Sequence, residues 1–317
     1  MIDQPFHFAP YLKSVIWGGE KIAPYKGIVT DQQQIGESWE LSAVPGHVSV
    51  VDRGPFEGQT LTELIDRFGA ELVGAPNFEK YGHDFPLLVK LIDARADLSV
   101  QVHPDDRLAA LRHGCKGKTE MWHLIDTDPG ARIYAGLKES ITPDEYEKRV
   151  ADNTIMDVIA AYESAPGDTF FLPAGRIHAI GAGNLLAEIQ QTSDITYRIY
   201  DYDRRDKDGN PRELHTEQAR DAIDYTVYPT YKSTPAGDCL AECPYFDVRR
   251  LPLTSAPAPV HYGRDSFTII MCLHGEGEIQ IPGSEAVKIR QGETLLFPAT
   301  MKSLTATGHG ELITVQS

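Results

Sequence analysis

The sequence predicts a mainly β protein with a few small helical insertions, and three observations support this fold class. Most apolar segments are short, rich in β-branched or aromatic residues, and bounded by Gly, Pro or Asp. Helical periodicity is confined to a few stretches. One pattern of strand, turn and returning strand occurs twice. The segments with the strongest strand pattern are 87–92, 98–102, 120–125, 169–172, 195–200 and 267–273.

Four stretches have the pattern of helices. In residues 60–73, Thr60 stands where an N-cap is needed, Glu63 follows three positions later, and apolar side chains recur along one face. The other three stretches are 105–113, 142–162 and 216–225. We therefore expect the helices to be insertions into a β framework.

Composition limits the class of partner. The 317 residues include 30 Lys and Arg against 46 Asp and Glu, a formal net charge of −16 at pH 7. Because such a surface repels polyanions, we expect a small-molecule ligand and no nucleic acid or membrane partner. Apolar runs fall far short of the ~20 residues that span a bilayer, and the first residues lack a secretory pattern. We expect a cytoplasmic protein, monomeric or homodimeric.

The repeat relates residues 167–178 to residues 292–303 at a constant offset, 292 − 167 = 125. The first copy fits the second half of the cupin signature, Gly-x5-Pro-x-Gly-x-x-His, from Gly167 to His178. The second copy has Ser303 in place of the histidine. In cupins this element lies beside the central cavity of a jelly roll. The prediction is two cupin-type jelly-roll barrels, with the helical insertions in the first.

The repeat also predicts how the chain divides. We expect residues 1–230 to form a catalytic cupin domain that contains the helical insertions. We expect residues 238–317 to form a second, degenerate cupin domain that lacks metal ligands. A linker is expected over 227–237, which has two prolines and no usable period.

Strand alternation around His178 predicts its partners at a metal site. In residues 98–104, Gln101 and His103 share one face with Ser99, while the valines between them point into the core. By the same parity Lys118 and Glu120 lie together on a later strand. The set of four is Gln101, His103, Glu120 and His178, whose mixed N and O donors suit Zn²⁺ and, less selectively, Mn²⁺, Fe²⁺ or Co²⁺.

Two further charged residues lie on polar-facing positions after the repeat. Glu188 corresponds at the repeat offset to Ile313, so the carboxylate is lost together with the histidine. This favours a site role for Glu188. Arg198, between Tyr197 and Tyr200, is either a site residue or a paired interior arginine.

Seven motifs in one order resemble the type I mannose-6-phosphate isomerases in their shorter bacterial form. They are FAPY (8–11), WGG (17–19), GESWE (36–40), SVQVHPD (99–105), KTEMW (118–122), PAGRIHA (173–179) and TYRIYD (196–201). The resemblance implies a cupin with one Zn²⁺ per chain that interconverts mannose 6-phosphate and fructose 6-phosphate. The family's metal ligands fall on the four residues already named, and its active-site arginine falls on Arg198. Ser99 and Lys90 resemble positions near the substrate.

Moving a carbonyl between C1 and C2 needs a base and a means of stabilising a cis-enediolate. Glu188 is the first candidate for the base, and Lys118 is the second because it would need a pKa lowered by burial and the metal. Arg198 and Lys118 would add positive charge near the sugar oxygens. Two alternatives stay open at this point: an Fe²⁺-dependent cupin oxygenase, and a sugar-phosphate-binding cupin without catalytic activity.

Overall fold

The computed structural model describes residues 2, 4–205, 209–235 and 237–317. Strands dominate it, so the mainly β fold class is confirmed, and every pairing between the named strands is antiparallel. The helices are α1 (Ile22–Lys26), α2 (Leu61–Phe68), α3 (Ala70–Val73), α4 (Ala75–Tyr81), α5 (Asp106–His113), α6 (Pro143–Ala151), the 3₁₀ helix η1 (Ile155–Val158) and α7 (Thr216–Ala222).

The strands form three sheets. The seven-stranded sheet has the order β13 (Lys232–Ser233), β9 (Thr169–Leu172), β6 (Glu120–Thr127), β11 (Asn184–Gln191), β4 (Leu87–Ala94), β2 (Tyr11–Gly19), β3 (Ile35–Leu41). The five-stranded sheet has the order β12 (Tyr197–Tyr200), β5 (Val100–Val102), β10 (His178–Ile180), β7 (Arg132–Leu137), β8 (Ile159–Glu163). The eight-stranded sheet has the path β1 (Phe6–His7), β19 (Thr294–Phe297), β17 (Thr268–Gln280), β20 (Thr305–Gln316), β15 (Asp247–Leu253), β14 (Cys239–Glu242), with β16 (Ala258–Pro259) on β20 and β18 (Val287–Arg290) on β17.

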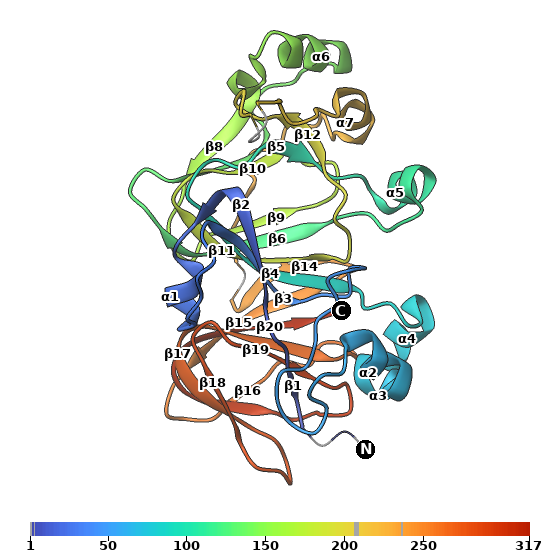
Figure 1. Ribbon diagram of the computed structural model, residues 1–317, viewed down its shortest axis with the longest axis vertical. Coiled ribbons are helices and arrows are strands. Elements are labelled where there is room, and N and C mark those ends of the chain that lie inside the picture. Colours follow the sequence, from blue (N-terminus) through green and yellow to red (C-terminus); the bar gives the residue numbers. More distant parts are fainter. Residues whose placement is uncertain (1, 3, 206–208, 236) are drawn as a thin grey trace.

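The seven-stranded sheet is the middle layer of the molecule (Figure 1). Val89 and Ile189, on one of its faces, share a core with Ile269 of the eight-stranded sheet. Trp122 and Leu186, on the other face, share a second core with the five-stranded sheet. Because both faces are covered, nearly all residues of the central strands β4, β6 and β11 are buried, and a polar residue there must find a partner inside the protein.

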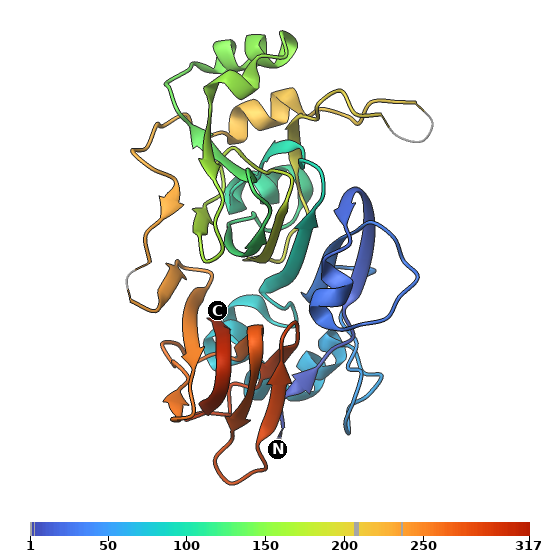
Figure 2. The ribbon, with the colours of Figure 1, turned by 90° about the vertical axis from the view of Figure 1, so that its left-hand side faces the viewer.

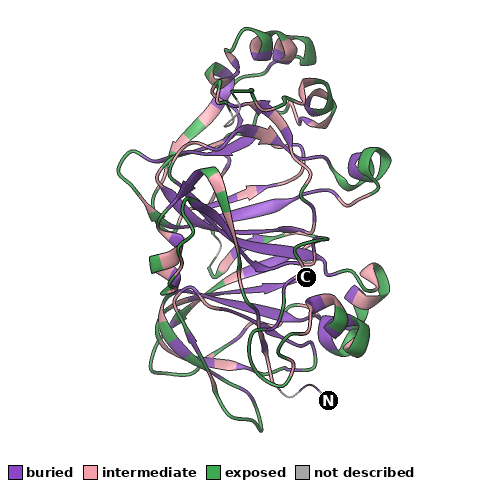
Figure 3. Ribbon diagram, viewed as in Figure 1, coloured by how far each residue is buried: buried purple, intermediate pink, exposed green. Residues whose placement is uncertain are grey.

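Helices cover the outer face of the five-stranded sheet, and two other helices pack beside the eight-stranded sheet. Tyr146 of α6 and Ala219 of α7 pack on Val100 and Val102, on the side of the five-stranded sheet away from the middle layer. Residues of α2 and α3 join the core beside the eight-stranded sheet. Figure 3 shows buried strands inside and exposed residues on the helices. The prediction that Val100 and Val102 point into a core is therefore confirmed.

The repeat has the same local structure in both copies. Strand β9 begins and ends 125 residues before β19, and Gly167 and Gly292 have matching φ angles of 87° and 79° in the preceding turns. The copies then diverge, because His178 begins β10 whereas Ser303 lies in a turn with a φ of 62°. The strand that follows in the second copy, β20, begins two residues later, at Thr305, so Ser303 does not stand on a strand as His178 does.

Three predicted elements need correction. The helix expected over 142–162 ends at Ala151, because Asn153 has a φ of 56°, and η1 and β8 follow. The helix expected over 60–73 begins with the predicted capping box at Thr60 but divides at Gly69. The predicted linker contains the short strand β13, which pairs with β9. Turns at Asn153 and Gly69 end the two helices despite the continuing apolar period, and a long-range pairing makes a strand of residues 232–233.

A buried ion pair joins the N-terminal residues to the C-terminal sheet. Lys26 donates to both carboxylate oxygens of Glu40, at 2.8 and 2.7 Å, and to the carbonyl oxygen of Gly292. Glu40 also accepts hydrogen bonds from Ser38 and Thr294. The pair therefore links α1, β3 and the segment before β19.

Replacing Lys26 by Met should destabilise the fold, because Glu40 would keep a buried charge without its cation. We expect the free energy of unfolding, measured by urea denaturation, to fall by about 3–5 kcal/mol. The double variant Lys26→Met/Glu40→Leu removes both charges and should recover most of that loss. A single variant as stable as the parent protein would contradict this interpretation.

Candidate metal centre

One row of polar residues crosses the inner face of the five-stranded sheet. Arg198 on β12 pairs with Gln101 on β5, and Gln101 pairs with His178 on β10. Their chain neighbours Val100, Val102 and Ala179 lie in the core on the opposite face. Strand alternation therefore turns this polar row toward the middle sheet.

The middle sheet supplies a second row that faces the first. Glu188 on β11 pairs with Trp122 on β6 and with Lys90 on β4. Glu120, two residues before Trp122, begins β6 on the same face. All these side chains are buried. The site is thus assembled from strands of two different sheets.

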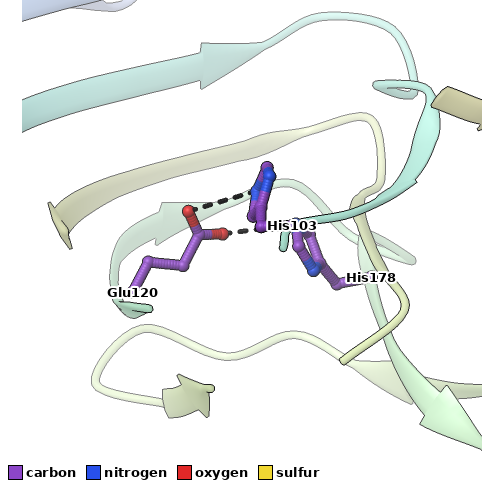
Figure 4. A group of neighbouring side chains, drawn as sticks. All are labelled: His103, Glu120 and His178. Carbon is purple, nitrogen blue, oxygen red and sulfur yellow. Dashed lines mark ion pairs between the residues drawn. The ribbon is translucent and has the colours of Figure 1, made fainter. Parts of the chain in front are cut away.

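His103, Glu120 and His178 form a compact group (Figure 4). Glu120 Oε2 lies 3.5 Å from His103 Nε2, and Glu120 Oε1 lies 3.3 Å from His178 Nε2. One nitrogen or oxygen atom from each residue lies within 4.8 Å of the others. Two imidazole nitrogens and a carboxylate are the donor set typical of a transition-metal site.

Backbone carbonyls orient both imidazoles. His103 Nδ1 lies 2.9 Å from the carbonyl oxygen of Ile195, and His178 Nδ1 lies 2.8 Å from that of Arg176. Each Nδ1 therefore donates its proton outward, and each Nε2 presents a lone pair to the centre. Hydrogen bonds of this kind set the tautomer and ring orientation of histidines that bind metals.

The electrostatics keep the histidines neutral. Burial and the charge of Lys118 lower the pKa of His178 to about 3 and that of His103 well below its ordinary value. Burial, reinforced by Glu188 and opposed by Lys118, raises the pKa of Glu120 to about 7. A cation among these groups would stabilise the ionised form of Glu120.

Glu120 Oε1 provides the test of fit for a metal ion. Among the described residues this buried atom has no hydrogen-bond partner. Its neighbour His178 Nε2 carries no proton when Nδ1 donates to Arg176, so two lone pairs face each other across 3.3 Å. A divalent cation satisfies both atoms at once, and the residues present therefore fit a metal ion.

Gln101 and Lys118 border the group. Gln101 Nε2 lies 3.2 Å from His178 Nε2, and rotating the amide by half a turn would direct Oε1 to the centre instead. Lys118 Nζ lies 3.0 Å from His103 Nε2 and donates to Glu120 Oε2. Lys118 thus contacts two of the three residues of the group, His103 and Glu120.

Both carboxylate oxygens of Glu188 have partners. Lys90 donates to Oε1 at 2.8 Å, and the indole of Trp122 donates to Oε2 at 2.9 Å. Burial opposes ionisation, but Lys90 and Lys118 outweigh it and lower the pKa of Glu188 to about 2. Lys90 has its pKa raised, since Glu188 and Glu37 outweigh the effect of burial. With Lys90 in place, Glu188 is a weak base.

The remaining predicted residues lie at the edges of this site. Arg198 is half-buried, and its Nη1 donates to the carbonyl oxygen of Glu213 at 2.9 Å. Its Nε has no hydrogen-bond partner among the described residues. Burial, together with Arg212, lowers the pKa of Arg198. Ser99 is buried directly before β5, two positions from Gln101.

Sequence reasoning assigned no role to two residues that touch this site. Trp122 holds Glu188 and lies edge-on to the ring of His178, with ring centroids 5.2 Å apart. Glu37 lies 3.7 Å from Lys90. Trp122 could have been found from its spacing of two from Glu120, whereas the contact of Glu37 depends on the pairing of β3 with β4.

A second acidic group in the described residues is less suited to a metal. Cys239, Glu242 and Asp247 lie close together at the edge of the eight-stranded sheet. Arg249, however, donates to Glu242 at 3.0 Å and to Asp247 at 2.7 Å. The guanidinium already neutralises these carboxylates.

Comparison with known proteins places the chain in a family. Residues 6–130 match the model for the phosphomannose isomerase type I catalytic domain, and residues 238–317 match that for the mannose-6-phosphate isomerase cupin domain. The chain is 35% identical over 321 residues to "Mannose-6-phosphate isomerase ManA" of Bacillus subtilis, covering 99% of both chains. It belongs to the type I phosphomannose isomerase family. The resemblance found in the sequence is therefore confirmed, and so is the assignment to a family of isomerase enzymes.

Other relatives of this phosphomannose isomerase agree. Mannose-6-phosphate isomerase of Streptococcus mutans is 34% identical over 326 residues, covering 99% of this chain and 98% of the relative. The crystal structure of the Bacillus subtilis enzyme superposes with a TM-score of 0.85 at 32% identity, over 98% of this chain and 99% of that one. Another structure, at 16% identity and a TM-score of 0.81, shares the fold and is described as bound with zinc and yttrium. In the described residues, no helix is long and apolar enough to cross a membrane.

The two copies of the repeat supply a matched test of the metal centre. His178→Ala removes one of the two imidazole nitrogens that face Glu120, so we expect the purified variant to lose its metal on dialysis. Ser303→Ala changes the corresponding residue of the second copy and should leave the metal content near that of the parent protein. Metal content is measured by atomic emission after dialysis. Equal retention by the two variants would refute the assignment of the centre to the first copy.

Proposed function

We propose that this protein is a zinc-dependent aldose–ketose isomerase that interconverts mannose 6-phosphate and fructose 6-phosphate through a cis-enediolate. The observation that carries the proposal is the convergence of His103 Nε2, His178 Nε2 and the carboxylate of Glu120 on one buried point. The names of the curated relatives support mannose 6-phosphate as one of the two substrates. A sugar phosphate is accordingly the proposed partner.

We propose one Zn²⁺ per chain, held by Gln101, His103, Glu120 and His178. Gln101 joins the group after the amide rotation described above. A bound Zn²⁺ supplies a Lewis acid that stabilises negative charge developing on the sugar oxygens. Proton transfer would then be carried out by the protein's own side chains.

The finer division of the fold is also a proposal. Residues 1–230 would form the catalytic cupin domain, and residues 238–317 a second cupin domain without metal ligands, each a jelly-roll barrel. The shared structure of β9 and β19 supports this repeat. The pairing of β1 with β19 adds N-terminal residues to the eight-stranded sheet. The cytoplasmic location and the monomeric or homodimeric state stay predictions.

Glu188 is our first candidate for the base that moves a proton between C2 and C1. Its ion pair with Lys90 makes it a weak base at rest, so Lys90 must turn away when substrate enters. A substrate hydroxyl or phosphate that accepts a hydrogen bond from Lys90 would bring this about and would return Glu188 toward the ordinary pKa of a buried carboxyl. Lys118 is the second candidate, and it would act after releasing Glu120.

Arg198, Lys90 and Ser99 complete the proposed site. Arg198 extends the polar row of the five-stranded sheet and would place a guanidinium beside the developing charge on the sugar. Lys90 and Ser99 would bind substrate from the middle sheet and from the start of β5. A base and a guanidinium beside the ligand group favour catalysis over binding alone, because a pure binding site has no use for a base.

Replacement of Glu188 by Gln tests the first candidate. In the described part of the chain Glu188 forms hydrogen bonds with Lys90 and Trp122 and none with the two histidines, so the variant should keep its metal while turnover falls by about 10²–10⁴-fold, the usual contribution of general acid–base catalysis. Metal content and turnover of mannose 6-phosphate are measured on the same preparation. Near-normal turnover would remove Glu188 from this role and leave Lys118.

Removal of the metal tests the proposed function as a whole. Dialysis against a chelator should abolish conversion of mannose 6-phosphate to fructose 6-phosphate, and added Zn²⁺ should restore it. A coupled assay for fructose 6-phosphate provides the measurement. Full activity after complete chelation would overturn the metal-dependent mechanism.

A further inference from the structure

The segment that joins the five-stranded sheet and its helices to the C-terminal, eight-stranded sheet packs on the outside of the former. After α7, residues 223–235 run down the surface toward β14 (Figure 2, yellow-orange to orange). The backbone N–H of Asp224 donates to the carbonyl of Gly175 at 2.8 Å. The hydroxyl of Tyr231 donates to the carbonyl of Leu137 at 2.9 Å, and its ring is buried against Gly136. This segment therefore does more than join two domains.

The guanidinium of Arg176 lies against the rings of two tyrosines of this segment, whose ring centroids are 5.7 Å apart. The guanidinium carbon lies 4.6 Å from the ring centroid of Tyr228 and 4.6 Å from that of Tyr231. The backbone N–H of Tyr228 donates to the hydroxyl of Tyr231, and the hydroxyl of Tyr228 donates to Asp224. Cation–π contacts are worth about 0.5–2 kcal/mol each, depending on exposure. Together they restrict the position of Arg176.

Arg176 lies in the turn that leads into the metal centre. Its carbonyl oxygen accepts the hydrogen bond from His178 Nδ1 at 2.8 Å. The neighbouring Gly175 donates its N–H to the carbonyl of His103 at 2.9 Å. Gly175 has a φ of 90°, and a Cβ at this position would lie 3.0 Å from the carbonyl oxygen of Ala222. The segment after α7 thus packs directly on the turn that aligns His178.

We propose that residues 223–231 act as a clamp on the metal centre, with Tyr228, Tyr231 and Arg176 as positioning residues for His178. The contacts with the two rings restrict the position of Arg176 and thereby of its backbone carbonyl. That carbonyl accepts the hydrogen bond that sets the tautomer and ring orientation of His178. Groups that orient a metal ligand in this way commonly change metal affinity by about 10–100-fold when removed. The proposal rests on the proposed metal site.

Tyr228 offers the cleanest test, because it is 40% exposed and its loss leaves the core intact. In Tyr228→Ala the ring over Arg176 is removed, and we expect Zn²⁺ affinity, measured by competition with a chelating dye, to fall about 10-fold. Tyr228→Phe keeps the ring and should bind within about 2-fold of the parent protein. Val227→Ala, at an exposed neighbour, serves as the control and should behave like the parent protein.

Two further measurements separate positioning from general stability. The visible absorption of the Co²⁺-loaded protein reports ligand geometry, and it should change in Tyr228→Ala alone. Thermal unfolding of the metal-free protein should be nearly the same for all three variants. In Tyr231→Phe, which keeps its ring but loses the hydrogen bond to Leu137, the Co²⁺ spectrum should persist even if the melting temperature falls.

The outcomes distinguish this proposal from the one on which it rests. A parent protein that binds no Zn²⁺ overturns both. A parent protein that binds Zn²⁺, together with a Tyr228→Ala variant of equal affinity and unchanged Co²⁺ spectrum, overturns the clamp and leaves the metal site standing. Equal weakening in Tyr228→Ala and Tyr228→Phe also overturns the clamp, because the ring would then not be the responsible group.

Discussion

The structure of the site depends on one buried carboxylate, Glu120. Its oxygens face His103 and His178, and backbone carbonyls direct the ring protons of both histidines away from it. Burying a carboxylate without a cation is costly, and the rise in the pKa of Glu120 to about 7 expresses that cost. Lys118 offsets part of it through a hydrogen bond to one oxygen. The other oxygen has no hydrogen-bond partner among the described residues, so under the proposed function a bound cation would stabilise this region.

The middle sheet makes such a group possible. Its central strands are buried on both faces, so one alternate set of side chains forms the core against the C-terminal sheet and the other set faces the site. Lys90 and Glu188 belong to the second set and satisfy each other across adjacent strands. A shift of one residue in register would place these charges in the apolar core, so the same pairing that builds the site also specifies the register.

Two sets of contacts outside the site support the strands and turns that carry it. The Lys26–Glu40 pair anchors one face of β3 to the C-terminal sheet, while Glu37 on the other face contacts Lys90. The segment after α7 packs on the turn before His178. The C-terminal sheet, whose copy of the repeat lacks the histidine, therefore still contributes to the site by holding β3, the strand that carries both Glu40 and Glu37.

Much of the site was determined by the sequence itself. The alternation of Gln101 and His103, the spacing of Lys118 and Glu120, and the motif ending at His178 are local patterns, and the structure brings these residues together as local patterns predict. Only the tertiary structure decided that Lys90 neutralises Glu188, that Trp122 donates to it, and that Tyr228 and Tyr231 contact Arg176. These contacts join residues far apart in the chain, and the free energy of each depends on burial and on a partner's position, neither of which a local period can encode.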